Sequence, residues 1–174
     1  KSPSVVKQIK QLITLLDKQI AQTQKDIRRH ISQHPHLKAQ VTLLSSIPGI
    51  GIQTAGRLLA ELGDLTQYAD VRQVVAMRGP DTTRRQSGSS LNHGTGIARM
   101  GHSSLRAALY MPAMAAARHN PILKVFAQRM TRNGLKPMEV IVSVMRKLLH
   151  LAYGVIKNNL PFDPEFGKVK PSTP

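Results

Sequence analysis

The stretch Ser-Ser-Ile-Pro-Gly-Ile-Gly at residues 45–51 decides the fold of this chain. It lies between two segments with helical spacing of apolar residues, 36–44 and 52–62, which is the pattern of a helix-hairpin-helix. Its glycines permit backbone conformations closed to other residues, and the amides before the second helix point outward at the positive end of the helix dipole. The hairpin therefore predicts contacts to a phosphate backbone, blind to base sequence, through Gly49, Ile50 and Gly51. The alternative is a hairpin that serves packing only.

Upstream of the hairpin, residues 4–33 form a heptad pattern typical of a long helix. We expect Pro35 to bend or end this helix, because a proline pushes the preceding residue out of the helical region. The helix either packs on its own domain or pairs two chains in a coiled coil, which would make the protein a homo-oligomer. Its apolar seam consists of Val6, Ile9, Ile13, Leu16, Ile20 and Ile27.

Downstream, cap residues and prolines mark further helices. The sequence has three Tyr, three Phe and no Trp, so the core must be aliphatic, which favours helices over strands. We therefore predict an all-α fold: a coiled-coil-like helical segment at 1–43, a helix-hairpin-helix and helical bundle with a basic loop at 44–160, and a flexible tail at 161–174. The further helices are expected at residues 71–77, 103–117 (kinked at Pro112), 121–132 and 137–156.

The charge balance points to a polyanionic partner. Twenty-five Lys and Arg stand against nine Asp and Glu, a formal net charge of +16, and nucleic acid is the leading candidate. The absence of cysteine excludes disulfides, thiolate zinc sites and cysteine nucleophiles. No apolar run approaches the roughly 18–20 residues of a membrane helix, and no signal peptide is visible, so we expect an intracellular protein without membrane contact. Because the chain opens with Lys1 and not Met, we expect it to begin inside a longer protein.

The segment 79–101 has no apolar periodicity and is predicted to be a loop. Between Val71 and Arg106 there are six Arg and no Lys, which favours bidentate contacts to phosphate over a generally solvated surface. A serine flanked by guanidinium groups could attack phosphorus; the alternative is a flexible loop that only binds phosphate. The carboxylates are scattered, and His30 and His34 lack a third ligand, so no metal site is expected within the chain.

Four blocks of residues stand out by their order and spacing: Ser46–Gly51 with Ala55 and Leu62-Gly63-Asp64, then Gly79-Pro80, then Gln86-Ser87-Gly88, and finally Gly94 with Ile97–Arg106. Together they resemble the C-terminal transposase domain of the insertion sequence 110 family (IS116/IS110/IS902 type). The resemblance covers residues 44 to about 163. His102 stands where the family usually has Asn, and Arg78 is less apolar than the family pattern.

The resemblance implies a DNA transposase or recombinase with a two-part active site. One part is a RuvC-like N-terminal domain with four acidic ligands for Mg²⁺, which these residues do not include, so the 174 residues alone should be inactive. The other part supplies a serine nucleophile, here Ser87 by the Gln-Ser-Gly block, with Ser89 and Ser90 as rivals. The resemblance also implies subunits paired by the coiled coil, in some members an element-encoded guide RNA, and work at the bacterial nucleoid. We expect Arg84 and Arg85 to assist the nucleophile, and the following to bind DNA beside the hairpin: Arg57, Arg99 and Arg106.

Two other classes of function remain open. A non-enzymatic helix-hairpin-helix module would tether a larger machine to nucleic acid, but it would not need Ser87 in an arginine-rich, lysine-free segment. A coiled-coil assembly domain, whose charge serves only solubility, would show no salt-sensitive DNA binding.

Overall fold

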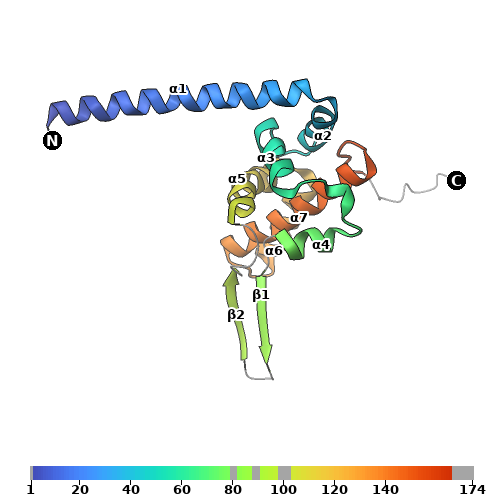
Figure 1. Ribbon diagram of the computed structural model, residues 1–174. Helices are drawn as coiled ribbons and strands as arrows, with labels where there is room; N and C mark the ends of the chain where they lie inside the picture. The colour runs from blue at the N-terminus through green and yellow to red at the C-terminus, as the bar shows by residue number, and fades with distance from the viewer. Residues whose placement is uncertain (1, 79–81, 88–90, 98–102, 166–174) are drawn as a thin grey trace. The chain divides into compact units, whose positions relative to one another are not determined.

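Helices make up most of the described chain, and the predicted all-α class is confirmed. The computed structural model describes residues 2–78, 82–87, 91–97 and 103–165. In chain order (Figure 1), its elements are α1 (Pro3–Gln33), α2 (Pro35–Ser45), α3 (Ile52–Leu62), the 3-10 turn η1 (Leu65–Gln67), α4 (Val71–Arg78), β1 (Thr82–Ser87), β2 (Leu91–Ile97), α5 (Ser103–His119), α6 (Pro121–Arg132) and α7 (Pro137–Asn158).

Three helices, α4, α6 and α7, begin at the residues that the sequence predicts, and a side chain caps the start of each. The carboxylate of Asp70 accepts a hydrogen bond from the amide two residues further on, at 3.0 Å, as α4 begins. Asn120 accepts from the amides two and three residues further on, both at 3.1 Å, and so caps α6. Glu139 reaches back to the amide of Lys136 at 2.9 Å at the start of α7. These local bonds satisfy amides that have no partner inside a helix.

The core is built around α7, which packs against α4, α5, α6 and η1. α5 also contacts α3 and α6, and it continues through the buried Pro112. Burial of one such aliphatic side chain stabilises the fold by about 1.5–3 kcal/mol before entropy is counted. The largest fully buried side chains are all aliphatic: Leu44, Ile47, Leu58, Leu62, Leu65, Leu105, Leu109, Leu123, Leu148, Leu149, Val74 and Val144.

The loop prediction for residues 79–101 is wrong where the chain forms β1 and β2. These strands pair antiparallel, with Ser87 opposite Leu91 and Thr82 opposite Ile97, and the register shifts by one residue between Thr82 and Arg84. Strands pair through backbone hydrogen bonds, which do not require alternating apolar side chains. The sequence of β1 and β2 lacks that alternation, so the pattern analysis did not detect the strands. The β1–β2 hairpin is the one sheet among the described residues.

Two compact units divide the chain, residues 1–39 and 40–174. The first contains α1, a helix of 31 residues with no buried side chain. Its six predicted seam residues are 40–54% exposed. No helix in the described ranges is long and apolar enough to cross a membrane.

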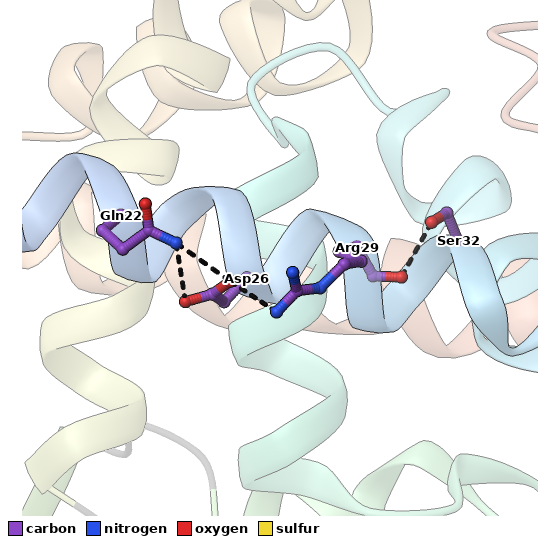
Figure 2. Close-up of polar contacts among 4 residues, drawn as sticks. All are labelled: Gln22, Asp26, Arg29 and Ser32. Carbon is purple, nitrogen blue, oxygen red and sulfur yellow. Dashed lines mark hydrogen bonds and ion pairs between the residues drawn. The ribbon is translucent and has the colours of Figure 1, made fainter.

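Polar side chains support the C-terminal half of α1 (Figure 2). Asp26 accepts hydrogen bonds from Gln22 at 3.2 Å and pairs with Arg29 at 2.7 Å. Ser32 donates to the backbone carbonyl of Arg29 at 2.7 Å. Exposed pairs of this kind contribute only about 0.3–0.5 kcal/mol each to helix stability, so they stabilise the helix slightly and do not drive its formation.

The chain after α7 returns toward the end of α2. Asn159 takes the left-handed conformation (φ 51°) and ends α7 at Asn158, two residues beyond the predicted end. The amide of Phe162 then donates to the hydroxyl of Ser46 at 2.7 Å. Of the expected tail, residues 166–174 lie outside the described residues.

Candidate nucleic-acid interface

The turn between α2 and α3 has buried isoleucine side chains and, directly after them, an exposed backbone segment. The side chains of Ile47 and Ile50 are 0% and 4% exposed, and the amide of Ile50 donates to the carbonyl of Ile47 at 2.9 Å. Gly51 and Ile52, directly after them, are exposed. Ile50 can therefore offer a ligand only its backbone, and the outward edge of the turn begins at Gly51.

Gly49 holds this turn against α5. Its φ is +107°, and a Cβ added there would stand 2.7 Å from Cβ and 2.9 Å from the backbone nitrogen of Ala116. Both the conformation and the contact require glycine. The buried Asn120, which caps α6, also donates to the carbonyl of Pro48 at 3.5 Å. Of the three hairpin residues predicted to bind DNA, Gly49 thus has a packing role that sequence reasoning missed.

The N-terminus of α3 follows this anchored turn. The amide of Ala55 is the first to donate along the helix, to the carbonyl of Gly51 at 2.8 Å. Gly51 is the N-cap and supplies no side-chain cap, so the amides of residues 52–54 have no carbonyl acceptor within the helix. Exposed amides at the positive end of a helix dipole favour an anion.

The predicted cation Arg57 has a structural partner. Its guanidinium donates to the carbonyl of Ser104 at 3.3 Å, and the Ser104 hydroxyl donates to Glu61 at 2.7 Å. The pair ties α3 to the first turn of α5. Arg106, two residues further along α5, is half-buried. Sequence reasoning missed Glu61 and Ser104, because their contact spans 43 residues and leaves no local pattern.

The predicted nucleophile and its arginines lie together on β1. Ser87 is its last residue; Arg84 and Arg85 stand opposite Gly94 and His93 of β2 in the backbone register. The rivals Ser89 and Ser90, and the predicted DNA contact Arg99, lie outside the described residues. The structure thus groups one set of predicted residues on β1 and another, Arg57 and Arg106, on the adjoining helices α3 and α5.

Among the described residues, the carboxylates do not form a site for two magnesium ions. Asp26 pairs with Arg29, Glu61 accepts from Ser104, and Asp70 and Glu139 cap helices. In the ranges that the structure describes, no three His, Asp or Glu side chains gather where a metal ion could be held.

One histidine, His150 on α7, has a shifted pKa. Burial lowers the pKa of His150 below its ordinary value of 6.5, the charges of Lys147 and Arg146 lower it further, and Asp70 opposes them. His150 is half-buried on α7 and does not belong to the α3 terminus. Its titration therefore affects the stability of the fold and not the proposed anion contact.

A basic helical domain with an anchored, exposed helix terminus and a strand of arginines and serine fits the class of proteins that handle DNA. Comparison with known proteins makes the assignment specific: residues 41–128 match the model of the Transposase IS116/IS110/IS902 family. The chain belongs to this family, as the resemblance predicted.

Individual relatives agree with this assignment. The chain is 36% identical over 152 residues to the pilin gene-inverting protein of Moraxella bovis, covering 87% of this chain and 45% of that protein. The pilin gene-inverting protein of Moraxella lacunata gives the same values. An insertion element IS110 protein of 43.6 kDa from Streptomyces coelicolor is 23% identical over 154 residues, covering 88% of this chain and 37% of that protein. The chain spans less than half the length of these curated relatives.

Proposed function

We propose that these 174 residues are the DNA-binding part of a transposase and supply its nucleophile, Ser87. Family membership is the observation that carries the proposal. Two relatives are named for the inversion of a pilin gene, which is a DNA rearrangement in those bacteria. A protein that rearranges chromosomal DNA would work at the bacterial nucleoid.

DNA binding is supported by charge and by the α3 terminus. The net charge of +16 favours any polyanion, and the amides after Gly51 offer a phosphate a set of donors that needs no base contact. Because Gly49 packs on Ala116 and the Ile50 side chain is buried, we assign the phosphate contact to the backbone that begins at Gly51.

The proposed chemistry is transfer of a DNA phosphoryl group to serine. The Ser87 Oγ forms a bond to phosphorus as its proton leaves, and the bond from phosphorus to one deoxyribose oxygen breaks; that oxygen takes up a proton. No atom changes oxidation state, and the reverse attack by a second strand would restore the serine. Arg84 and Arg85 would offset the charge on the serine oxygen and on the phosphoryl oxygens.

The rest of the machinery is proposed from the family resemblance. Mg²⁺ would belong to a RuvC-like domain beyond the matched part of the relatives, and without it the 174 residues would bind DNA but not exchange strands. Subunits would pair through α1, whose seam is exposed. An element-encoded guide RNA is a further proposed partner.

A salt titration of the 174-residue chain on duplex DNA tests the binding half of this proposal. Contact with three phosphates gives a slope of about −2.7 in a plot of log affinity against log salt, which is a loss of about 40-fold between roughly 50 and 200 mM. Binding that barely changes over this range would show that phosphate contacts do not drive it.

A further inference from the structure

A shallow groove runs between the C-terminal part of α5 and α6, with a volume of about 650 Å³. Three exposed cations line it: Arg118 from α5, and Lys124 and Arg132 from α6. The small side chains of Ala117 and Ala127 leave room between them. None of the groove's lining residues is acidic, so its charge is wholly positive.

These cations are available to a ligand. Among the described residues, the ion pairs Asp26–Arg29 and Asp70–Arg72 lie away from the groove, and none of its three cations is found in an ion pair. Lys124 and Arg132 are eight residues apart on one face of α6, which is about 12 Å along the helix axis. A DNA strand carries a phosphate about every 3.4 Å of duplex axis, so the two ends of this row lie about three to four phosphate steps apart.

The groove begins next to the anchored turn. Gly49 packs on Ala116, the residue before Ala117, and Asn120 joins the start of α6 to the carbonyl of Pro48. These contacts fix the turn that precedes α3 to the helices that form the groove. A single backbone could therefore engage the α3 terminus and continue into the groove.

We propose that this α5–α6 groove binds the phosphate backbone of duplex DNA, as an extension of the contact at α3. The three cations contact phosphates along one backbone without reading bases. The inference rests on the proposed DNA-binding function and adds a second stretch of the DNA path, carried by Arg118, Lys124 and Arg132.

The test compares two double variants of the 174-residue chain that lose the same charge. Lys124→Gln with Arg132→Gln removes two groove cations. The control, Arg129→Gln with Lys147→Gln, removes two exposed cations outside the groove; Arg129 lies 5.6 Å from the ring centre of Phe126. Fluorescence anisotropy measures the affinity for a labelled duplex across a salt series.

We expect the groove variant to lose about 1.8 units of the log–log salt slope, or 0.9 per phosphate contact, and the control to lose less than about half a unit. A separate double variant that keeps both charges, Lys124→Arg with Arg132→Lys, should show the parental slope. If the parent binds with a steep slope and the groove variant keeps it, or the control loses as much, the groove assignment is wrong while the proposed function stands. If the parent has no salt-dependent binding, the proposed function itself fails.

Two further measurements complete the design. Circular dichroism checks that the α6 variants stay helical; if they do not, Arg118→Gln on α5 must lower the slope by about 0.9 on its own, or the proposal is overturned. The same series on an RNA duplex separates the two nucleic acids. A groove variant impaired on RNA but unchanged on DNA would make the groove an RNA site and contradict the assignment to DNA.

Discussion

Gly49 and Ala116 approach so closely that no side chain fits between the turn and α5. A Cβ atom at Gly49 would stand 2.7 Å from the Cβ of Ala116, and the φ of Gly49 is +107°. This contact joins the α2–α3 turn to a core helix 67 residues later in the chain. The position of the α3 terminus, where we place the phosphate contact, depends on it.

Gly49→Ala should destabilise the chain. A positive φ costs a residue with a side chain about 1–2 kcal/mol, and overpacking against Ala116 adds about 1–3 kcal/mol. Urea denaturation measures the change in unfolding free energy. Gly51→Ala is the matched control, since a Cβ there has no atom within 4 Å and its φ is −90°; we expect it to cost less than about 1 kcal/mol. Equal effects of the two substitutions would show that the contact with α5 does not hold the turn.

Replacing Ile13 and Ile20 by Asp should convert an oligomer into a monomer. Both residues are more than half exposed within the chain, and two buried carboxylates in a coiled-coil seam would have no partners. Light scattering gives the mass before and after the change. The control replaces Gln11 and Lys18, each midway between two seam residues at the heptad position that faces away from the seam, by Asp and should keep the parental mass. A monomeric parent would contradict pairing through α1.

His150 should make the fold less stable in mild acid. Because burial lowers its pKa in the folded state, the unfolded chain binds more protons below about pH 6.5, and the free energy of unfolding falls as the pH drops. His150→Gln removes this contribution, so its stability should fall less between about pH 7 and pH 5. Parallel urea titrations of parent and variant measure the two slopes, and identical slopes would show that His150 does not titrate on unfolding.

Local chemistry made much of the fold predictable. Asp70 and Asn120 cap helices through bonds to amides two or three residues away, so short stretches of sequence contain all the information needed. The strands β1 and β2 lack alternating apolar residues and pair through the backbone, which is why Thr82–Ser87 was predicted to be a loop.

The candidate site was predictable only in part. Gly49 and Arg57 were chosen as DNA contacts from a motif and from charge. Their structural partners, Ala116 and Ser104, lie 67 and 47 residues away in the chain. Contacts at that separation are set by how helices pack, and one sequence contains no signal for them.

Substitutions on β1 should separate binding from catalysis. In a complete transposase that contains these residues, Ser87→Ala should abolish strand exchange and change DNA binding by less than about 1 kcal/mol, the scale of one hydrogen bond. Arg84→Ala or Arg85→Ala should weaken both, since cations serve the bound and reacting states alike. Gel-based strand-exchange and anisotropy assays measure the two properties. Ser89→Ala and Ser90→Ala are the matched controls, expected to retain exchange.

Mass spectrometry of the covalent protein–DNA adduct tests the central claim most directly. The complete protein is incubated with Mg²⁺ and a DNA substrate that traps the cleaved intermediate, and the modified peptide is sequenced. We predict one phosphodiester-linked nucleotide on Ser87, absent from the Ser87→Ala protein. An adduct on Ser89, Ser90 or a tyrosine, or full strand exchange by Ser87→Ala, would contradict the assignment.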